Sequence, residues 1–206
     1  MTSNETLSAL VPEDLTDFYY MQLHITARCN LRCKHCYQEQ YEDEGRDLLE
    51  PVEILDIIEQ FKGFLDEREA RGKIYFSGGE PMLDPRLYRY ITHAKENDLI
   101  TMILSNGTLI DAKRAQELKS AGLDIAQVSL DGMREVHDTL RGEGCFNRST
   151  KALDECHEAG IHTTVMVTLS NLNAGNLKAL TEHCIKHDVT RIAFGRLVPE
   201  GHGKQL

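Results

Sequence analysis

Strand-like and helix-like segments alternate along nearly the whole chain, and this alternation restricts the possible folds more than any other feature. Residues 18–26 (FYYMQLHIT) are apolar and β-prone, whereas residues 51–71 repeat apolar side chains at helical spacing behind Pro51. Further strands are expected at 73–77, 100–104, 125–130, 162–169 and 191–197, and further helices at 85–97, 111–121, 147–159 and 174–187. Because one helix between successive strands returns the chain to the same edge, the strands must pair in parallel.

Six such units predict an α/β fold, a partial (β/α)6 TIM-like barrel of parallel strands that is cut after the sixth strand. A doubly wound parallel sheet is the second possibility. We expect residues 1–17 to be a polar N-terminal extension and residues 18–206 to form one domain. The sequence stops at 201–206, where a helix covering the last strand is due, so we expect a fragment of a longer protein.

The composition is that of an ordinary globular protein, with 41% hydrophobic and 27% charged residues among 206. No apolar run approaches the roughly 20 residues that cross a bilayer, and residues 1–17 lack the basic and apolar regions of a secretory signal. The net charge of −10, from 23 basic and 33 acidic residues, argues against a nucleic-acid or anionic-membrane surface. We therefore expect a cytoplasmic protein without nucleic-acid or membrane partners.

The unusual residues of this sequence directly follow the expected strands. Cysteines gather at 29–36 after the first strand, and Gly-Gly-Glu occupies 78–80 after the second. Ser-Asn-Gly and Ser-Leu-Asp-Gly follow the next two strands, at 105–107 and 129–132. Active sites of parallel α/β folds lie at the carboxyl ends of the strands. The four loops are therefore expected to converge on one pocket, which favours an enzyme.

Cys29, Cys33 and Cys36 lie within eight residues, with gaps of three and then two residues. Zinc sites favour paired C-x2-C hooks, and a redox dithiol needs only two thiols. Three thiolates on one short loop can hold three corners of an iron–sulfur cube and leave the fourth iron without a protein ligand. The non-enzymatic alternatives are an iron–sulfur electron carrier, which would need a fourth cysteine nearby, and a zinc-binding structural module.

With these loops in view, the chain resembles the radical S-adenosylmethionine (SAM) enzymes over nearly its whole length. The resemblance rests on motifs at 29–36, 78–81, 105–107, 129–132 and 140–142. It implies a 4Fe-4S cluster held by Cys29, Cys33 and Cys36 as catalytic and metal-ligating residues, with SAM chelated by the free iron. It also implies that one electron from the cluster cleaves SAM to a 5′-deoxyadenosyl radical, which removes hydrogen from a substrate.

The same resemblance assigns SAM-binding roles to residues in the first two loops. His35 occupies the position where the family places a ring near the adenine, although a loop side chain facing solvent is an equal alternative. The backbone of Gly78 and Gly79, together with Glu80, would receive the methionine ammonium, which side chains at the two glycines would obstruct. Ser77 is adjacent and would assist.

The later strand ends supply the remaining predicted SAM contacts. Ser129 resembles the residue that binds the ribose hydroxyls, and Asn106 either lines the pocket or only forms an Asn-Gly turn. Arg141 resembles the arginine that pairs with the SAM carboxylate in peptide-modifying members; the alternative is a surface arginine. Thr168 and Leu197 lie where family members contact adenine, although core packing is the better interpretation for these two positions.

Two motifs of this chain resemble one branch of the family, whose members carry a C-terminal SPASM or Twitch extension with auxiliary clusters. These motifs are Cys-Asn-Leu-Arg-Cys-x-His-Cys-Tyr and Arg-Leu-Val-Pro-x-Gly. Residues matching that extension are missing from this sequence. We expect an oxidoreductase that modifies a ribosomally made peptide or protein, with a small molecule of tetrapyrrole or haem biosynthesis as the alternative substrate. A reductant such as flavodoxin or ferredoxin would be its electron-donating partner.

Overall fold

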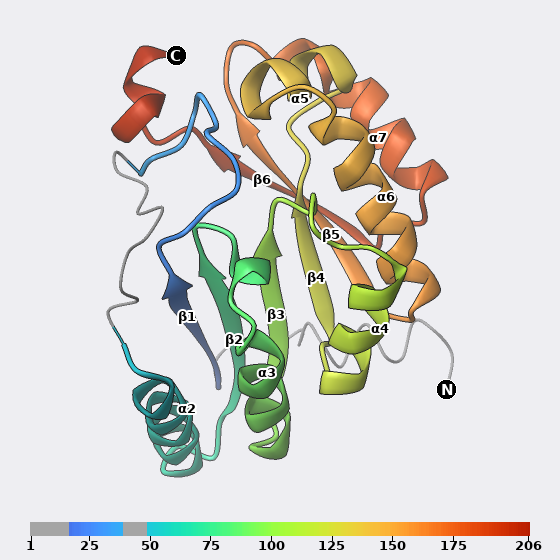
Figure 1. Cartoon of the computed structure of the whole chain (residues 1–206). Helices are drawn as coiled ribbons and strands as arrows, with labels where there is room; N and C mark the ends of the chain where they lie inside the picture. Colours follow the sequence, from blue (N-terminus) through green and yellow to red (C-terminus); the bar gives the residue numbers. More distant parts are fainter. Residues whose placement is uncertain (1–16, 39–48) are drawn as a thin grey trace.

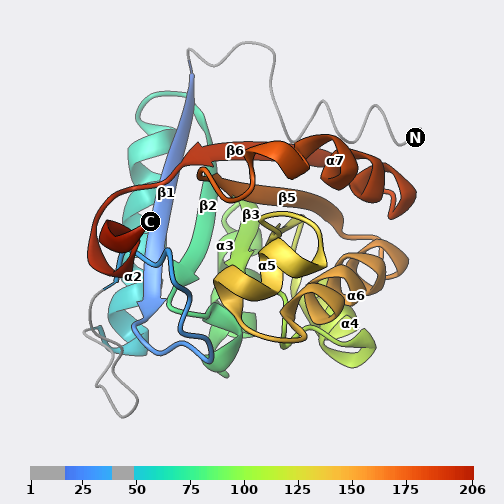
Figure 2. The same ribbon diagram turned by 90° about the horizontal axis from the view of Figure 1, so that it is seen from above.

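The computed structural model describes residues 17–38 and 49–206, so the expected N-terminal extension, residues 1–17, lies outside the described residues apart from Asp17. Six strands form one sheet in sequence order, and each neighbouring pair is parallel. The strands are β1 (Phe18–Thr26), β2 (Arg71–Gly78), β3 (Ile100–Ser105), β4 (Ile125–Ser129), β5 (His162–Leu169) and β6 (Arg191–Arg196). The sheet curls into a half-barrel with helices outside its curve (Figure 1, Figure 2), which confirms the predicted partial barrel.

The helices follow the strands in the expected alternation. They are α2 (Pro51–Asp66), α3 (Leu87–Glu96), α4 (Ala112–Ala121), α5 (Arg134–Arg141), α6 (Cys145–Glu158) and α7 (Leu177–Lys186). Short 3-10 turns occupy η1 (Pro81–Leu83), η2 (Ala174–Asn176) and η3 (Gly201–Gln205). None of the helices in the described part of the chain has the length and apolar character needed to span a membrane.

Local chemistry explains where these helices begin and end. At the start of α2, the Glu53 carboxylate accepts a hydrogen bond from the Glu50 backbone N–H at 2.7 Å, as in a capping box. At the start of α4, the Asp111 carboxylate accepts from the Arg114 N–H at 2.8 Å. Gly122 ends α4 in the left-handed region, with φ of 98°.

Most predicted helices shift by one to three residues at an end, and two helices differ from the sequence prediction by more than this. The helix predicted over 51–71 ends at Asp66, because Glu69 turns the chain with a φ of 51° and β2 already begins at Arg71. The short helix α5 was not predicted at all. Only Val136 and Leu140 are aliphatic among its eight residues, too few for a periodic signal.

Side chains on each strand alternate between the helix-covered outside and the interior of the half-barrel. On β2, Ile74 and Phe76 are fully buried in the main core, which also contains Ile58 of α2 and Tyr90 of α3. The intervening residues of the strands, such as Tyr75, therefore face the interior of the curl. This alternation decides which residues can line a cavity within the half-barrel.

Candidate active site

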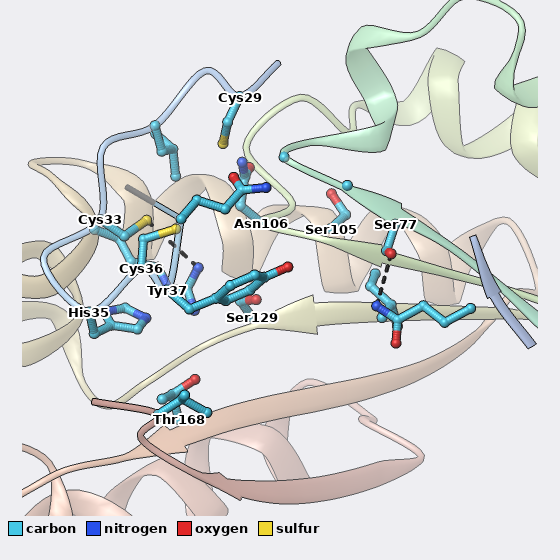
Figure 3. Close-up of a pocket in the computed structure, with 18 of the residues that line it drawn as sticks. Cys29, Cys33, His35, Cys36, Tyr37, Ser77, Ser105, Asn106, Ser129 and Thr168 are labelled. Atoms are coloured by element: carbon cyan, nitrogen blue, oxygen red, sulfur yellow. Dashed lines mark hydrogen bonds between the residues drawn. The ribbon is translucent and has the colours of Figure 1, made fainter. Parts of the chain in front are cut away.

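A cavity of about 290 Å³ lies where the carboxyl ends of the strands meet the cysteine loop (Figure 3). It brings together most of the residues singled out from the sequence. These are Cys29, Cys33, His35, Cys36, Ser77, Gly78, Gly79, Asn106, Ser129, Arg141 and Thr168. Glu80 and Leu197, which were also singled out, are not among its lining residues.

The cysteine loop, residues 29–36, is tied down by backbone hydrogen bonds. The Lys34 N–H donates to the Leu140 carbonyl at the end of α5 at 2.9 Å, and the Gly203 N–H of η3 donates to the Cys36 carbonyl at 3.2 Å. Burial raises the pKa of the Cys33 thiol to about 11, although the positive charge of Arg141 opposes this shift. A metal that binds this thiol must therefore displace its proton.

The three thiols of the loop face one cavity. Figure 3 shows Cys29, Cys33 and Cys36 on the same side of it. In a 4Fe-4S cluster each thiolate binds a different iron atom, so three thiols grouped in this way can serve three irons of one cluster. Among the described residues, no group of three histidine, cysteine or acidic side chains is placed to hold a single metal ion.

A fourth thiol lies behind the loop but outside the cavity. Cys145 is buried against Leu31 and Cys33. Its Sγ donates to the Arg141 carbonyl at 3.5 Å and accepts from the Arg148 guanidinium at 3.3 Å. In the described part of the chain, the cavity is therefore lined by three thiols, not four.

The glycine loop after β2 packs directly against the segment that leads into the cysteines. The Gly79 N–H donates to the Thr26 carbonyl at 2.9 Å, and the Glu80 N–H donates to the Arg28 carbonyl at 2.8 Å. A Cβ at Gly78, whose φ is 146°, would collide with the Thr26 carbonyl, and one at Gly79 would collide with that of Arg28. The structure thus explains both glycines by close packing of two backbone segments. The sequence analysis had instead expected them to leave room for a ligand.

Glu80 lies beneath the cavity floor. Its fully buried carboxylate accepts from the Ser105 hydroxyl at 2.7 Å, from the Asn106 N–H at 2.8 Å and from the Met82 N–H at 3.2 Å. Burial raises its pKa, and these hydrogen bonds oppose the rise. Three of roughly four acceptor positions are thus occupied within the fold. In this structure Glu80 joins the loops after β2 and β3.

Asp131, which the sequence analysis gave no role, organises the opposite wall. The carboxylate accepts from Arg141 Nε at 2.5 Å and from the Thr168 N–H at 2.8 Å, and lies 3.4 Å from His35 Nε2. Burial alone would raise the pKa of Asp131, but Arg141 and His35 outweigh it and lower the pKa. The only sequence signal was its place directly after β4, ten residues before Arg141.

Arg141 and His35 both face the cavity, so the solvent-exposed alternatives considered for them are wrong. The Arg141 side chain is 10% exposed, and its Nη1 lies 4.0 Å from Cys33 Sγ. Burial and the charge of Arg141 lower the pKa of His35 to about 4, which keeps the ring neutral near pH 7. The buried His35 Nδ1 has no hydrogen-bond partner in the described structure, as expected of a group that meets a ligand.

The other predicted residues divide between the cavity and the framework. Asn106 lines the cavity and also forms the turn, because its Oδ1 accepts from the Thr108 N–H at 2.9 Å. Leu197 donates its N–H to the Leu169 carbonyl at 3.0 Å and does not line the cavity. Further lining residues, not predicted from the sequence, are Gln22, Leu31, Tyr37, Gln38, Leu104, Ser105, Arg196 and Val198.

The chain is similar to one protein family over most of its length. A family model described as the radical SAM superfamily matches residues 23–184. The chain is 34% identical to the Fe-coproporphyrin III synthase of Methanosarcina barkeri, covering 89% of this chain and 45% of that protein. It is 30% identical to the AdoMet-dependent heme synthase of Oleidesulfovibrio alaskensis, covering 88% and 46% respectively. The chain thus spans about half the length of these curated relatives.

Solved structures share the fold at lower identity. Streptococcus suis SuiB bound to its precursor peptide SuiA superposes with a TM-score of 0.74 at 18% identity, over 95% of this chain and 43% of SuiB. Native anSMEcpe with bound AdoMet superposes with a TM-score of 0.72 at 18% identity, over 88% of this chain and 52% of the other. At this identity the likeness is one of fold.

Proposed function

The chain belongs to the radical SAM superfamily, whose members use SAM and a 4Fe-4S cluster, and on this premise we propose that Cys29, Cys33 and Cys36 hold that cluster. When bound, the two cofactors supply a 5′-deoxyadenosyl radical that removes a hydrogen atom from the substrate, after a donor such as flavodoxin or ferredoxin has provided one electron. The observation that carries the proposal is a cavity lined by three thiols from one loop.

The residues around the thiols have distinct proposed tasks. Arg141 keeps its Nη groups directed toward the cavity while Nε binds Asp131, so the guanidinium can pair with the SAM carboxylate. The carbonyls of Gly78 and Gly79 accept the ammonium protons. Ser129 offers its hydroxyl to the ribose, at the end of β4.

Two further residues complete the proposed SAM site. The neutral His35 ring and Thr168 flank the space proposed for the adenine. Ser77 serves as a support for this site, because its hydroxyl accepts from Gln22 Nε2 at 3.0 Å and donates to the Leu23 carbonyl at 3.3 Å.

For the substrate, we propose a tetrapyrrole of haem biosynthesis. Over most of its length, the chain is 34% identical to an Fe-coproporphyrin III synthase and 30% identical to a heme synthase, and these identities support this choice. The sequence motifs alone favoured a ribosomally made peptide or protein, which we keep as the second candidate. The fold shared with SuiB, solved with its precursor peptide, supports that candidate.

The cluster assignment can be tested on the anaerobically reconstituted protein. We expect about four irons per chain, together with dithionite-dependent formation of 5′-deoxyadenosine from SAM. Cys33→Ala should lose both iron and product. Cys145→Ala tests the nearby thiol outside the cavity, and Cys184→Ala is a matched control in a different core cluster. Iron loss in Cys145→Ala as well would indicate a four-cysteine cluster and favour an electron carrier.

The substrate is tested separately. An iron-coproporphyrin and a candidate precursor peptide would each be added to the active protein, and products would be followed by mass spectrometry. Conversion of the tetrapyrrole supports the proposal. Conversion of a peptide alone would replace it with the second candidate.

A further inference from the structure

A second cavity, of about 200 Å³, lies in the interior of the half-barrel below the candidate active site. Its lining includes Lys73, Tyr75, Gln127, Thr164 and Arg191. These residues come from the amino-terminal parts of β2, β4, β5 and β6, at the opposite end of the sheet from the cysteine loop. The proposed function so far gives this cavity no role.

Lys73 is the unusual residue of this cavity. Only 4% of the residue is exposed, and no hydrogen bond or ion pair joins its ammonium group to another described residue, although the nitrogen itself still reaches solvent within the cavity. Lysine is almost never fully buried unless it is paired, because removing an ammonium group from water costs free energy. Burial and the nearby charge of Arg191 both lower the pKa of Lys73, so the two cations lie close enough to repel each other.

The nearest negative charge is already engaged elsewhere. Asp124 opposes the lowered pKa of Lys73, but its carboxylate binds Lys95 Nζ at 3.0 Å and accepts from the Thr101 N–H at 2.9 Å. No aspartate or glutamate occurs among the described residues that line this cavity. The two cations therefore have no acidic counterpart within the cavity.

The strand-end cavity differs, because its Arg141 is already paired with the Asp131 carboxylate, and Arg196 is its other cationic lining residue. The chain as a whole carries a net charge of −10. Two cations without an acidic lining residue in the lower cavity, inside an acidic protein, are the arrangement expected for an anionic ligand.

The two cavities follow one another along the same inward-facing rows of side chains. Tyr75 lines the lower cavity and Ser77 the upper one on β2, and Gln127 and Ser129 do the same on β4. Ser77 lies four residues after Lys73 on the strand, which corresponds to about 13 Å. The two cavities share no lining residue, so a ligand that is held at Lys73 and extends into the upper cavity must displace side chains between them, such as Tyr75 and Leu104.

We propose that Lys73 and Arg191 bind an anionic arm, a carboxylate or a phosphate, of the substrate whose other end lies at the strand-end cavity. This proposal rests on the proposed function and adds the substrate class, an elongated or broad molecule with an acidic group roughly 13 Å from the reacting end. The Tyr75 hydroxyl and the Gln127 amide supply further donors for such a group. Burial raises the pKa of Tyr75 to about 12, so its hydroxyl keeps the proton that it donates.

The test uses two small anions as probes on the reconstituted protein, without SAM or an electron donor. Thermal unfolding is measured in succinate, in inorganic phosphate and in sodium chloride at matched ionic strength. At a probe concentration ten times its Kd, we expect Tm to rise by about 3–5 °C over the chloride sample. The larger rise, with succinate or with phosphate, identifies the preferred group.

Lys73→Met and Arg191→Gln should each remove most of this rise, with a ten- to hundredfold weaker probe affinity. Met102→Leu changes the same cavity without changing its charge or its hydrogen-bond donors and should keep the rise, as should Lys113→Met on the exposed face of α4. If Lys73→Met does not fold, the test relies on Arg191→Gln, because Arg191 is exposed and its substitution should not prevent folding.

The proposal is overturned if Lys73→Met and Arg191→Gln each show the same anion-dependent rise in Tm as the wild-type protein. It is also overturned if the wild-type protein shows no rise. Because neither SAM nor an electron donor is present, these results are independent of the proposed function. A protein that cleaves SAM but shows no anion-dependent stabilisation would overturn the anion site and leave the enzyme assignment standing.

Discussion

Arg141 Nε lies 2.5 Å from the Asp131 carboxylate, and this buried ion pair joins the loop after β4 to the end of α5. The same carboxylate contacts His35, and the same guanidinium reaches within 4.0 Å of Cys33. One pair of opposite charges therefore fixes two side chains that face the proposed cofactors.

Asp131→Asn should strongly destabilise the protein. The substitution leaves the Arg141 guanidinium buried without its counter-charge, and breaking a buried pair in this way costs about 3–5 kcal/mol. Urea unfolding measures the change in the free energy of unfolding. Asp154→Asn removes an ion pair to His187 at a half-exposed site and should cost less than about 1 kcal/mol. Equal effects of the two substitutions would mean that the buried pair adds no stability.

Arg141→Gln should weaken SAM binding to the cluster-loaded protein about 10- to 100-fold, through the loss of charge-assisted hydrogen bonds. Isothermal titration calorimetry gives the dissociation constant. Arg134→Gln, at the exposed start of the same helix α5, is the matched control and should leave SAM binding unchanged. An unchanged constant in Arg141→Gln would limit Arg141 to supporting Asp131.

Gly79→Ala should disturb the cysteine loop, because the new Cβ collides with the Arg28 carbonyl just before Cys29. We expect a lower Tm and less iron per chain after reconstitution. Gly63→Ala is the control, since a Cβ at this position in α2 has no atom within 4 Å. It should stabilise the helix by about 0.5–1 kcal/mol. Normal iron loading in Gly79→Ala would show that the loop tolerates the displacement.

Acidification should destabilise the fold through His137. This ring is buried, its Nδ1 accepts from the Asp131 N–H at 3.1 Å, and burial together with Arg141 lowers its pKa to about 4. Asp131 and Asp138 oppose the shift. Because the unfolded chain takes up this proton near pH 6.5, the stability contribution is present above that pH and is lost as the pH falls toward 4.

The slope from this one group is at most about 1.4 kcal/mol per pH unit. Urea unfolding between pH 7 and pH 4.5 would measure it. His137→Asn keeps an acceptor for the Asp131 N–H and should flatten the curve, whereas His157→Asn on the exposed face of α6 should not. Identical curves for wild type and His137→Asn would contradict the prediction.

Much of the framework could be predicted from the sequence because its signals are local. β1 and β5 have the predicted bounds, and α4 begins one residue after the start of the predicted range 111–121 and ends with it. The helix α5 gave no such signal. It is short and mostly polar, and its place is set by tertiary contacts such as the bond from Lys34 to Leu140.

The site was only partly predictable for the same reason. Spacing alone identified the cysteines and the glycine loop, because those motifs are contiguous. The role of Asp131 depends on Thr168, Arg141 and His35, which are distant in sequence and meet only in the folded chain. Likewise, the place of Glu80 beneath the cavity depends on β3 lying next to β2.

The order of the strands has a consequence for the size of molecule that the interior can admit. In the described chain, β1 and β6 are the two borders of the sheet, and no ladder of backbone hydrogen bonds joins them. The separation of these borders can therefore increase without breaking any strand pairing. A closed barrel of eight strands has no such borders, so widening its interior would require breaking a strand pair.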